Sequence, residues 1–275
     1  MRASSPSDPE WAENLFGFEV LIVDHVLLVR INRPEVGNSL SRRMREPMAR
    51  IWERLDADDD LRVAVVTGAG DRHFCTGADV REIAGDGAVP SGDAADEPIV
   101  WSPVARGVRK PVLCAVNGVA AGGGLHFVAD ADIVIAAEHA AFLDTHVSVG
   151  QVGAVENVGL THRLPFGTAM RMTLQGTGYR LDAARAHALG LVDEVVPAAE
   201  LETTALEIAR SIAANSPRAV QLSRAVLWDS LGRPRQEAEA AGWQIAQEHW
   251  KHPDFLEGAR AFAEKRAPRW TVGEP

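Results

Sequence analysis

The chain carries two patterns of apolar residues. Nearly continuous apolar runs and alternating apolar and polar residues dominate its first two-thirds. Apolar residues at helical spacing dominate the last third. The runs predict buried strands at 62–68 (RVAVVTG) and 111–118 (PVLCAVNG), and the alternation in FEVLIV and VLLVRINRP predicts two strands joined near Asp24. Further short strands are expected at 133–136 and in LVDEVV. Helices are expected over 39–57, 79–84, 123–129, 181–189, 198–213, 217–230, 234–250 and 253–265.

This order predicts an α/β protein in three parts: a polar tail at 1–14, a core of strands and helices at 15–198, and a helical region at 199–275. Residues 85–97 (GDGAVPSGDAADE) are rich in Gly, Pro, Ala and Asp, which predicts a surface loop. Because the loop follows a candidate site motif, we interpret it equally as a plain linker or as a flap over an active site.

Composition and charge narrow the range of possible functions. The 275 residues carry a formal charge of −10 with a sequence pI of about 5.4, which argues against a nucleic-acid partner. There is no apolar run of membrane-spanning length and no apolar segment at the start, so we expect a cytoplasmic protein with no membrane partner. The two cysteines, Cys75 and Cys114, form no CxxC pair, and we expect no metal.

Two segments share the order strand, glycine turn, helix. They are VVTGAGDRHFCTGADVRE at 65–82 and KPVLCAVNGVAAGGGLHF at 110–127. Glycine allows close approach of a ligand to the backbone, and the start of a helix presents unpaired N–H groups. Two such turns facing each other would direct two donors at one carbonyl oxygen and form an oxyanion hole. Taken singly, each turn is better explained by tight packing of a helix on a strand.

The motifs INRPEVGNSLS, FCTGADV, KPVLCAVNGVAAGGGL, DADIVIAAEHAAF and AFAEKRAPRW follow one another in the order found in the enoyl-CoA hydratase/isomerase (crotonase) superfamily, which the chain resembles over roughly 17–270. The resemblance implies a spiral ββα core with a C-terminal helical region that drives trimerisation, often as a dimer of trimers. It also implies an acyl-CoA thioester as substrate, with coenzyme A as part of that substrate and no separate cofactor.

The resemblance also implies site residues. The backbone amides of Ala78, in GAD, and Gly123, the middle residue of GGG, would hold the thioester carbonyl. Asp79 would order the turn or cap the next helix. Contacts with CoA would come from Lys265, in EKR, and from Asn38 and Leu40, in the first motif.

The chain departs from the family at the acid/base positions. Hydratases of the family carry two glutamates beside the bound water, and the corresponding residues here are His126 and His146. Histidine suits proton transfer near neutral pH, and the helix dipole is expected to keep His126 neutral. Glu156, ten residues after His146, is expected either to fix the tautomer of that imidazole or to be only a first-turn helix residue. Asp144 could be another acid near the site, but we favour its interpretation as a turn residue.

Three functions follow. The first is an enzyme that stabilises the enolate of an acyl-CoA at Ala78 and Gly123 and transfers protons through histidine. The second is a hydrolase that breaks a C–C bond, because crotonase-like β-diketone hydrolases resemble this chain at His146 and, allowing one inserted residue, at Glu156. The third is a non-catalytic acyl-CoA-binding protein that has kept the fold.

Overall fold

The structure is a computed structural model that describes residues 15–86 and 99–271. The expected N-terminal tail and nearly all of the expected loop at 85–97 lie outside the described residues. None of the described helices is both long enough and apolar enough to span a bilayer.

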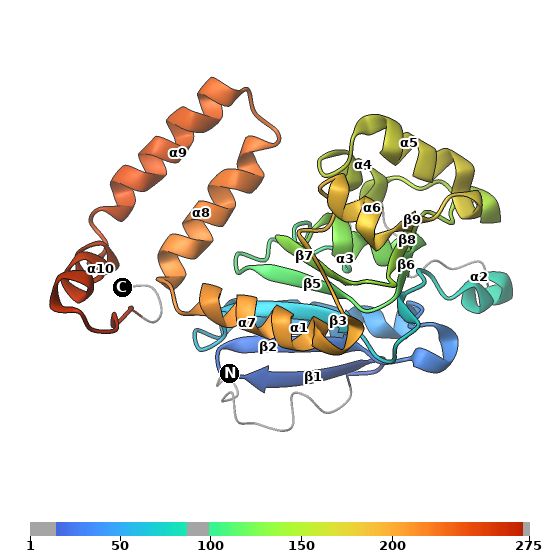
Figure 1. The fold of residues 1–275 in the computed structure, drawn as a ribbon, viewed down its shortest axis with the longest axis horizontal. Coiled ribbons are helices and arrows are strands. Elements are labelled where there is room, and N and C mark those ends of the chain that lie inside the picture. Colours follow the sequence, from blue (N-terminus) through green and yellow to red (C-terminus); the bar gives the residue numbers. More distant parts are fainter. Residues whose placement is uncertain (1–14, 87–98, 272–275) are drawn as a thin grey trace.

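A six-stranded sheet forms the centre of the molecule, with the order β1-β2-β3-β5-β7-β10 (Figure 1). Its strands are β1 (Phe18–Val23), β2 (Val26–Ile31), β3 (Val63–Gly68), β5 (Val112–Val116), β7 (Ile133–Ala137) and β10 (Glu194–Val196). The first two strands form an antiparallel hairpin, and all the other pairs are parallel. Strands β3 and β5 are buried along their whole length, as their continuous apolar runs predict for strands covered on both faces.

A second sheet has the order β4-β6-β8-β9. Its strands are β4 (His73–Cys75), β6 (Val119–Ala121), β8 (Ala141–Leu143) and β9 (Leu181–Asp182). In the described chain, a strand of the large sheet is followed three times by a strand of the small sheet and then by a helix: β3-β4-α2, β5-β6-α3 and β7-β8-α4. This is the expected spiral ββα core, and it brings the ends of β4, β6 and β8 to one place.

Seven helices of the described chain belong to this core: α1 (Arg45–Ala57), α2 (Val80–Asp86), α3 (Leu125–Ala129), α4 (Val155–Thr161), α5 (Phe166–Gln175), α6 (Ala183–Ala188) and α7 (Leu201–Ala213). Helix α1 buries Met48, Ile51 and Trp52, and the indole N–H of Trp52 donates to the carbonyl of Val100. Helix α7 packs on the large sheet along β2, β3, β5 and β7 (Figure 1).

The last three helices, α8 (Pro217–Ser230), α9 (Arg235–His249) and α10 (Pro253–Glu264), form a helical tail that projects from the core (Figure 1). Their bounds confirm the expected segments 217–230, 234–250 and 253–265 to within one residue. Neither α8 nor α9 contains a buried residue. The tail is fastened to the core where Arg224 Nε and Trp228 Nε1 donate to the carboxylate of Asp132, at 2.8 and 2.6 Å.

Some boundaries differ from those expected. The helix predicted from residue 39 begins as a 3-10 turn at Arg42–Met44, because the Ser41 hydroxyl accepts the N–H of Arg43 and Leu40 is held in a bridge to Ala78. The helix predicted from 181 begins at Ala183, because Leu181 and Asp182 pair with β8. Helix α5 was not predicted.

Candidate active site

The first glycine turn is fixed by Leu40. The Leu40 N–H donates to the carbonyl of Gly77, and the Asp79 N–H donates to the carbonyl of Leu40, each at 2.8 Å. Asp79 has the structural role expected of it, since its carboxylate pairs with Arg33 at 3.0 Å and accepts the N–H of Arg81 at 3.2 Å. The Ala78 amide between these bonds donates to no other described residue.

The second glycine turn, Gly122–Gly124, packs directly against the first. A Cβ atom on Gly77, where φ is +85°, would lie 2.8 Å from the nitrogen of Gly123, so the contact requires glycine. The Gly123 amide also has no acceptor in the described part of the chain. Both Ala78 and Gly123 are partly exposed, so two unpaired backbone donors lie in adjoining, accessible turns.

His126 lies on α3, just after the second turn, and its side chain is only 3% exposed. Its Nε2 atom lies 3.3 Å from Oε2 of Glu156, and its Nδ1 atom is buried with no hydrogen-bond partner among the described residues. Burial, followed by the nearby charge of His146, lowers the pKa of His126 to about 4. The imidazole is therefore neutral, as expected, and burial is the larger cause.

His146 follows β8 and precedes a 3-10 turn, and its side chain is 17% exposed. Its Nδ1 atom lies 2.7 Å from Oδ1 of Asp144 and 3.2 Å from Oε1 of Glu156. The hydrogen bond with Asp144 is the main cause that raises the pKa of His146, and the charge of Glu156 adds to it. With Nδ1 engaged, Nε2 is the ring nitrogen without a partner in the described chain.

Asp144 belongs to this cluster and is not merely a turn residue, which corrects the interpretation from sequence. It is completely buried, and its second oxygen accepts a 2.7 Å hydrogen bond from Asn157 Nδ2, which also donates to Thr173 at 2.9 Å. Burial alone would raise the pKa of Asp144, but the hydrogen bonds from His146 and Asn157 outweigh it and lower that pKa. Asp144 is thus a buried, ionised partner of His146.

Glu156, in the first turn of α4, lies between the two imidazoles and is 5% exposed. Each of its oxygens approaches a different ring: Oε2 approaches Nε2 of His126, and Oε1 approaches Nδ1 of His146. The contact of Oε1 is at ion-pair distance without hydrogen-bond geometry, so this buried oxygen has no hydrogen-bond donor in the described chain. Burial is the main cause that raises the pKa of Glu156, with the charges of Asp144 and Asp130 adding to it.

The three expected CoA contacts lie in different environments. The Asn38 side chain is fully buried and holds two loops together, accepting from the N–H of Arg33 and donating to the carbonyls of Ala69 and His73. Leu40 is buried beneath the two glycine turns. Lys265 is exposed at the end of α10, in the helical tail and far from α3 and α4 of the same chain (Figure 1).

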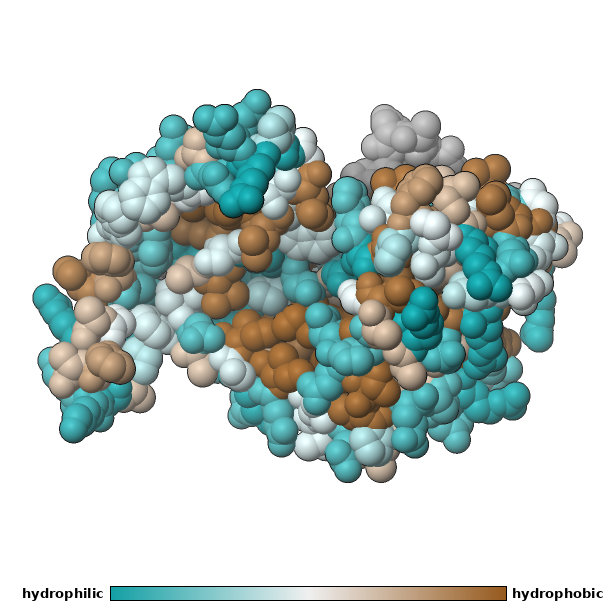
Figure 2. Space-filling view, turned by 45° about the horizontal axis from the view of Figure 1, so that its top comes forward, coloured by the Kyte–Doolittle hydropathy of each residue, from teal (hydrophilic) through white to brown (hydrophobic). Residues whose placement is uncertain are grey.

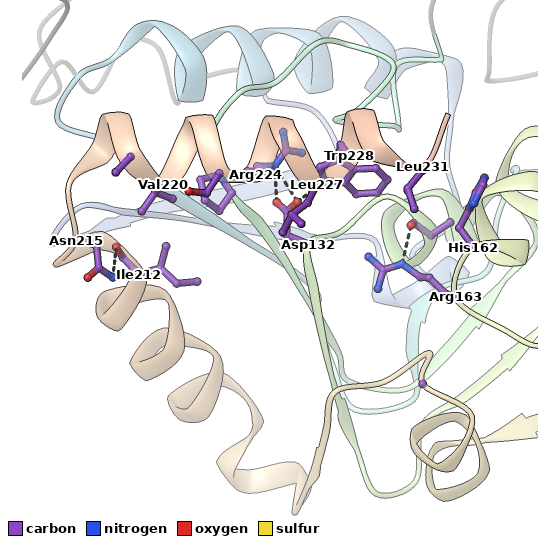
Figure 3. Close-up of a pocket in the computed structure, with 15 residues that line it drawn as sticks. Asp132, His162, Arg163, Ile212, Asn215, Val220, Arg224, Leu227, Trp228 and Leu231 are labelled. Carbon is purple, nitrogen blue, oxygen red and sulfur yellow. Dashed lines mark hydrogen bonds and ion pairs between the residues drawn. The ribbon is translucent and has the colours of Figure 1, made fainter. Parts of the chain in front are cut away.

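A groove of about 700 Å³ lies elsewhere, between α8 and the core (Figure 3). Its wall includes Ala129, at the end of α3, together with Leu227, Trp228 and the Arg224–Asp132 pair. None of His126, His146 and Glu156 lines it. The groove and the cluster of titratable side chains are therefore separate features of the described structure.

Comparison with known proteins gives a consistent result. The pattern of the enoyl-CoA hydratase/isomerase family matches residues 22–273. Enoyl-CoA hydratase EchA19 of Mycobacterium tuberculosis is 36% identical over 254 residues, which cover 90% of this chain and 93% of that protein. The (E)-benzylidenesuccinyl-CoA hydratase of Thauera aromatica is 33% identical over 255 residues, covering 90% and 96% of the two chains.

A crystal structure of an enoyl-CoA hydratase/isomerase from Mycobacterium paratuberculosis superimposes with a TM-score of 0.86 at 37% identity, covering 94% of this chain and 99% of that one. Sequence pattern and three-dimensional fold thus agree over nearly the whole length. The chain belongs to the enoyl-CoA hydratase/isomerase family.

Proposed function

We propose that this member of the family binds an acyl-CoA thioester, stabilises its enolate at the backbone amides of Ala78 and Gly123, and transfers protons through histidine. The observation that carries the proposal is the 2.7 Å hydrogen bond between His146 and Asp144, which leaves Nε2 of the imidazole free. A Cβ atom on Gly122, next to Gly123, would lie 3.8 Å from Cε1 of His146, so the ring lies beside the second glycine turn.

The two amides would act on the thioester oxygen. When a proton leaves the carbon next to the thioester, or a nucleophile adds to a conjugated carbon, negative charge moves to that oxygen. Two fixed N–H donors stabilise the charge without reorganising, and one such donor is typically worth about 2.7–4 kcal/mol in the transition state. The proposal requires the unpaired amides of Ala78 and Gly123 to point at a common position.

His146 would act as the general base. Its Nδ1 hydrogen points to Asp144, so Nε2 carries the lone pair that accepts a proton from water or substrate. The buried carboxylate then stabilises the imidazolium that forms. His126, which is neutral, would position or protonate the substrate. An imidazole pair does not reproduce two glutamates around one water, so we expect slow hydration of simple crotonyl-CoA.

A second reaction, hydrolysis of a C–C bond, is favoured by the two carboxylates that face His146 at 2.7 and 3.2 Å. In that reaction His146 would remove a proton from water as the oxygen adds to a ketone carbonyl. The C–C bond would then break toward an enolate held by the two amides, and the enolate carbon would regain the proton. The substrate would be a β-dicarbonyl compound and need not be a CoA ester.

The assembly we propose is a homotrimer or a dimer of trimers, in which Lys265 reaches the CoA site of a neighbouring subunit. Large apolar side chains support it, since Trp243 is 57% exposed, Phe262 88%, and Phe166 on α5 68%. Figure 2 shows apolar surface gathered in the hollow between the helical tail and the core. Surface of this kind is typical of a face that another subunit covers.

The experiment that tests the proposal is turnover of a panel of enoyl-CoA, saturated acyl-CoA and 3-oxoacyl-CoA thioesters, with a CoA-free β-diketone beside them, in D₂O. Reaction through an enolate places deuterium on the carbon next to the carbonyl, and C–C hydrolysis gives two acyl products. We expect deuterated product from at least one CoA thioester. Binding of CoA thioesters without any turnover would instead support the non-catalytic alternative.

A further inference from the structure

The hydroxyl of Thr145 lies beside the second glycine turn, and its residue directly precedes His146. A Cβ atom on Gly122 would lie 2.8 Å from Oγ1 of Thr145 and 3.8 Å from Cε1 of His146. The same point is 3.9 Å from Cα of Gly77, in the first glycine turn. We propose that Thr145 is a further catalytic residue, whose hydroxyl and Nε2 of His146 together bind the oxygen that the reaction adds to the substrate or removes from it. The inference rests on the proposed function, because it takes His146 as the general base.

The Thr145 hydroxyl is accessible and has no partner among the described residues. Thr145 is only partly exposed, yet its oxygen neither forms a hydrogen bond within the described chain nor is closed off from solvent. The nearby Ser148 hydroxyl, by contrast, is engaged, since it accepts the N–H of Thr177 at 2.9 Å. Nε2 of His146 is accessible and without a partner as well. Two adjacent residues therefore present two unpaired polar atoms to solvent beside one glycine turn.

A water molecule bound by both groups would be oriented for attack. It would donate one hydrogen to Nε2 of His146 and the other to Oγ1 of Thr145, which leaves a lone pair of its oxygen for the substrate carbon. As the C–O bond forms, the first hydrogen passes to Nε2, and the electrons of the attacked double bond move to the carbonyl oxygen. The imidazolium later releases that proton to the substrate carbon or to solvent. The second hydrogen stays on the product oxygen, and loss of water follows the same steps in reverse.

The second contact to the water cannot come from the two carboxylates beside His146. One hydrogen bond to the imidazole leaves a water free to turn, so its orientation needs another fixed group. Asp144 is completely buried and Glu156 is 5% exposed, and both approach Nδ1 of the ring rather than Nε2. The Thr145 hydroxyl is accessible and borders the same glycine turn as Cε1, the ring carbon bonded to Nε2. Thr145 therefore supplies the contact that the carboxylates do not.

The test compares a reaction that adds water with one that does not. The first is water addition to the enoyl-CoA or 3-oxoacyl-CoA that the wild type turns over fastest. The second is exchange, in D₂O, of the hydrogen next to the thioester in a saturated acyl-CoA, which needs the oxyanion hole and the base but no reacting water. Thr145→Val keeps the branched shape of the side chain and removes only the hydroxyl, whereas Thr145→Ser keeps the hydroxyl. Thr203→Val, at an exposed position on α7, is the matched control.

In Thr145→Val we expect water addition to slow by about tenfold, the rate equivalent of one hydrogen bond, and hydrogen exchange to keep its wild-type rate. Thr145→Ser should recover most of the lost rate, and Thr203→Val should match the wild type. Unchanged water addition in Thr145→Val would overturn the proposal. Equal losses in the two reactions would do so too, because they would indicate a packing role.

The wild type separates this inference from the function on which it rests. A wild-type enzyme that exchanges the hydrogen but adds water to none of the thioesters would overturn the role of Thr145 and leave the oxyanion hole and the base in place. A wild type that acts on no CoA thioester would refute the proposed function, and this inference with it.

Discussion

The Nδ1 nitrogen of His146 lies 2.7 Å from Oδ1 of Asp144, and the same oxygen accepts the backbone N–H of His146 at 3.0 Å. The carboxylate therefore holds both the ring and the chain that carries it. This arrangement fixes the tautomer with hydrogen on Nδ1 and raises the pKa of the imidazole. As the proposed general base, the imidazole would accept its proton at Nε2, the ring nitrogen that has no partner in the described chain.

Replacing His146 by Ala should lower kcat by about a hundred- to ten-thousand-fold, the usual contribution of a general base. Affinity for the CoA thioester should change little, because the proposed oxyanion donors are backbone amides. Steady-state kinetics together with calorimetric binding of the thioester measure the two quantities. The control is His162→Ala, on the exposed end of α4, which should keep wild-type kcat. If the His146→Ala enzyme keeps its activity, His146 has only a structural role.

Replacing Asp144 by Asn should move the pH dependence of the reaction. Because the hydrogen bond with Asp144 raises the pKa of His146, removing its charge lowers that pKa. The rising limb of kcat/KM, which reports loss of the proton from His146, should then shift to lower pH by about one unit or more. The plateau rate should also fall, because the base is weaker. A limb that stays at its wild-type pH would mean that Asp144 does not control the titration.

Gly153 lies against the cluster, and a methyl group there should disturb it. A Cβ atom would lie 2.5 Å from Nδ2 of Asn157 and 2.7 Å from Oδ2 of Asp144, too close for either group to stay in place. A displacement on the order of 1 Å can cost about a hundredfold in rate. We therefore expect Gly153→Ala to lower kcat by that factor. Gly167→Ala, on α5, meets no atom within 4 Å and should leave kcat unchanged. Equal kcat values for the two variants would mean that the cluster around Asp144 takes no part in the reaction.

His126 should make the fold less stable in acid. Its pKa is about 4 in the folded chain and near 6.5 when unfolded, so between these values the unfolded chain binds a proton that the folded chain does not. Stability is therefore lost as pH falls through this window. Relative to His126→Gln, the wild type should lose about 2 kcal/mol of unfolding free energy between pH 7 and pH 5. Urea unfolding of both proteins at the two pH values measures the difference, and parallel behaviour would mean that folding does not lower the pKa of His126.

The fold could be predicted well from sequence. Buried parallel strands such as β3 and β5 are continuous apolar runs, and the apolar residues of α8, α9 and α10 recur at helical spacing. The ends of helices and strands were harder to predict where backbone pairing between distant segments overrides the local preference for helix. Leu40 reads as the first turn of a helix, but its backbone bonds to Gly77, 37 residues later. Helix α5 buries only Ala169 and Met172 and exposes Phe166 and Leu174, so several of its large apolar residues do not face the core.

The site could be predicted in part. The family's motifs point to His126 and His146, and the spacing suggests Glu156, but neither indicates that Glu156 contacts both rings. Asp144 was considered as an acid near the site but ranked below a turn residue, although a signal for its contact exists: an aspartate commonly accepts the N–H of the second residue after it, here His146. Asn157 was missed as well, because its contact with Asp144 depends on how α4 packs beside β8.

The assembly gives a further prediction. Static light scattering at micromolar concentration should give the mass of a trimer or of a dimer of trimers, because α9 and α10 expose Trp243, Trp250 and Phe262. Replacing Phe262 by Glu should shift the distribution toward smaller species, since a charge at an apolar interface is left without a partner. A wild-type protein that is a stable monomer would contradict the expected trimer.

The most direct test of the central claim is a crystal structure with a CoA thioester bound. In that structure we expect the thioester oxygen to lie about 2.7–3.1 Å from the backbone nitrogens of both Ala78 and Gly123. We also expect Nε2 of His146 to lie about 2.6–3.2 Å from the reacting group or from a water beside it. An ordered site in which the two amides point apart, or a thioester seated in the groove beneath α8 and away from His146, would contradict the account.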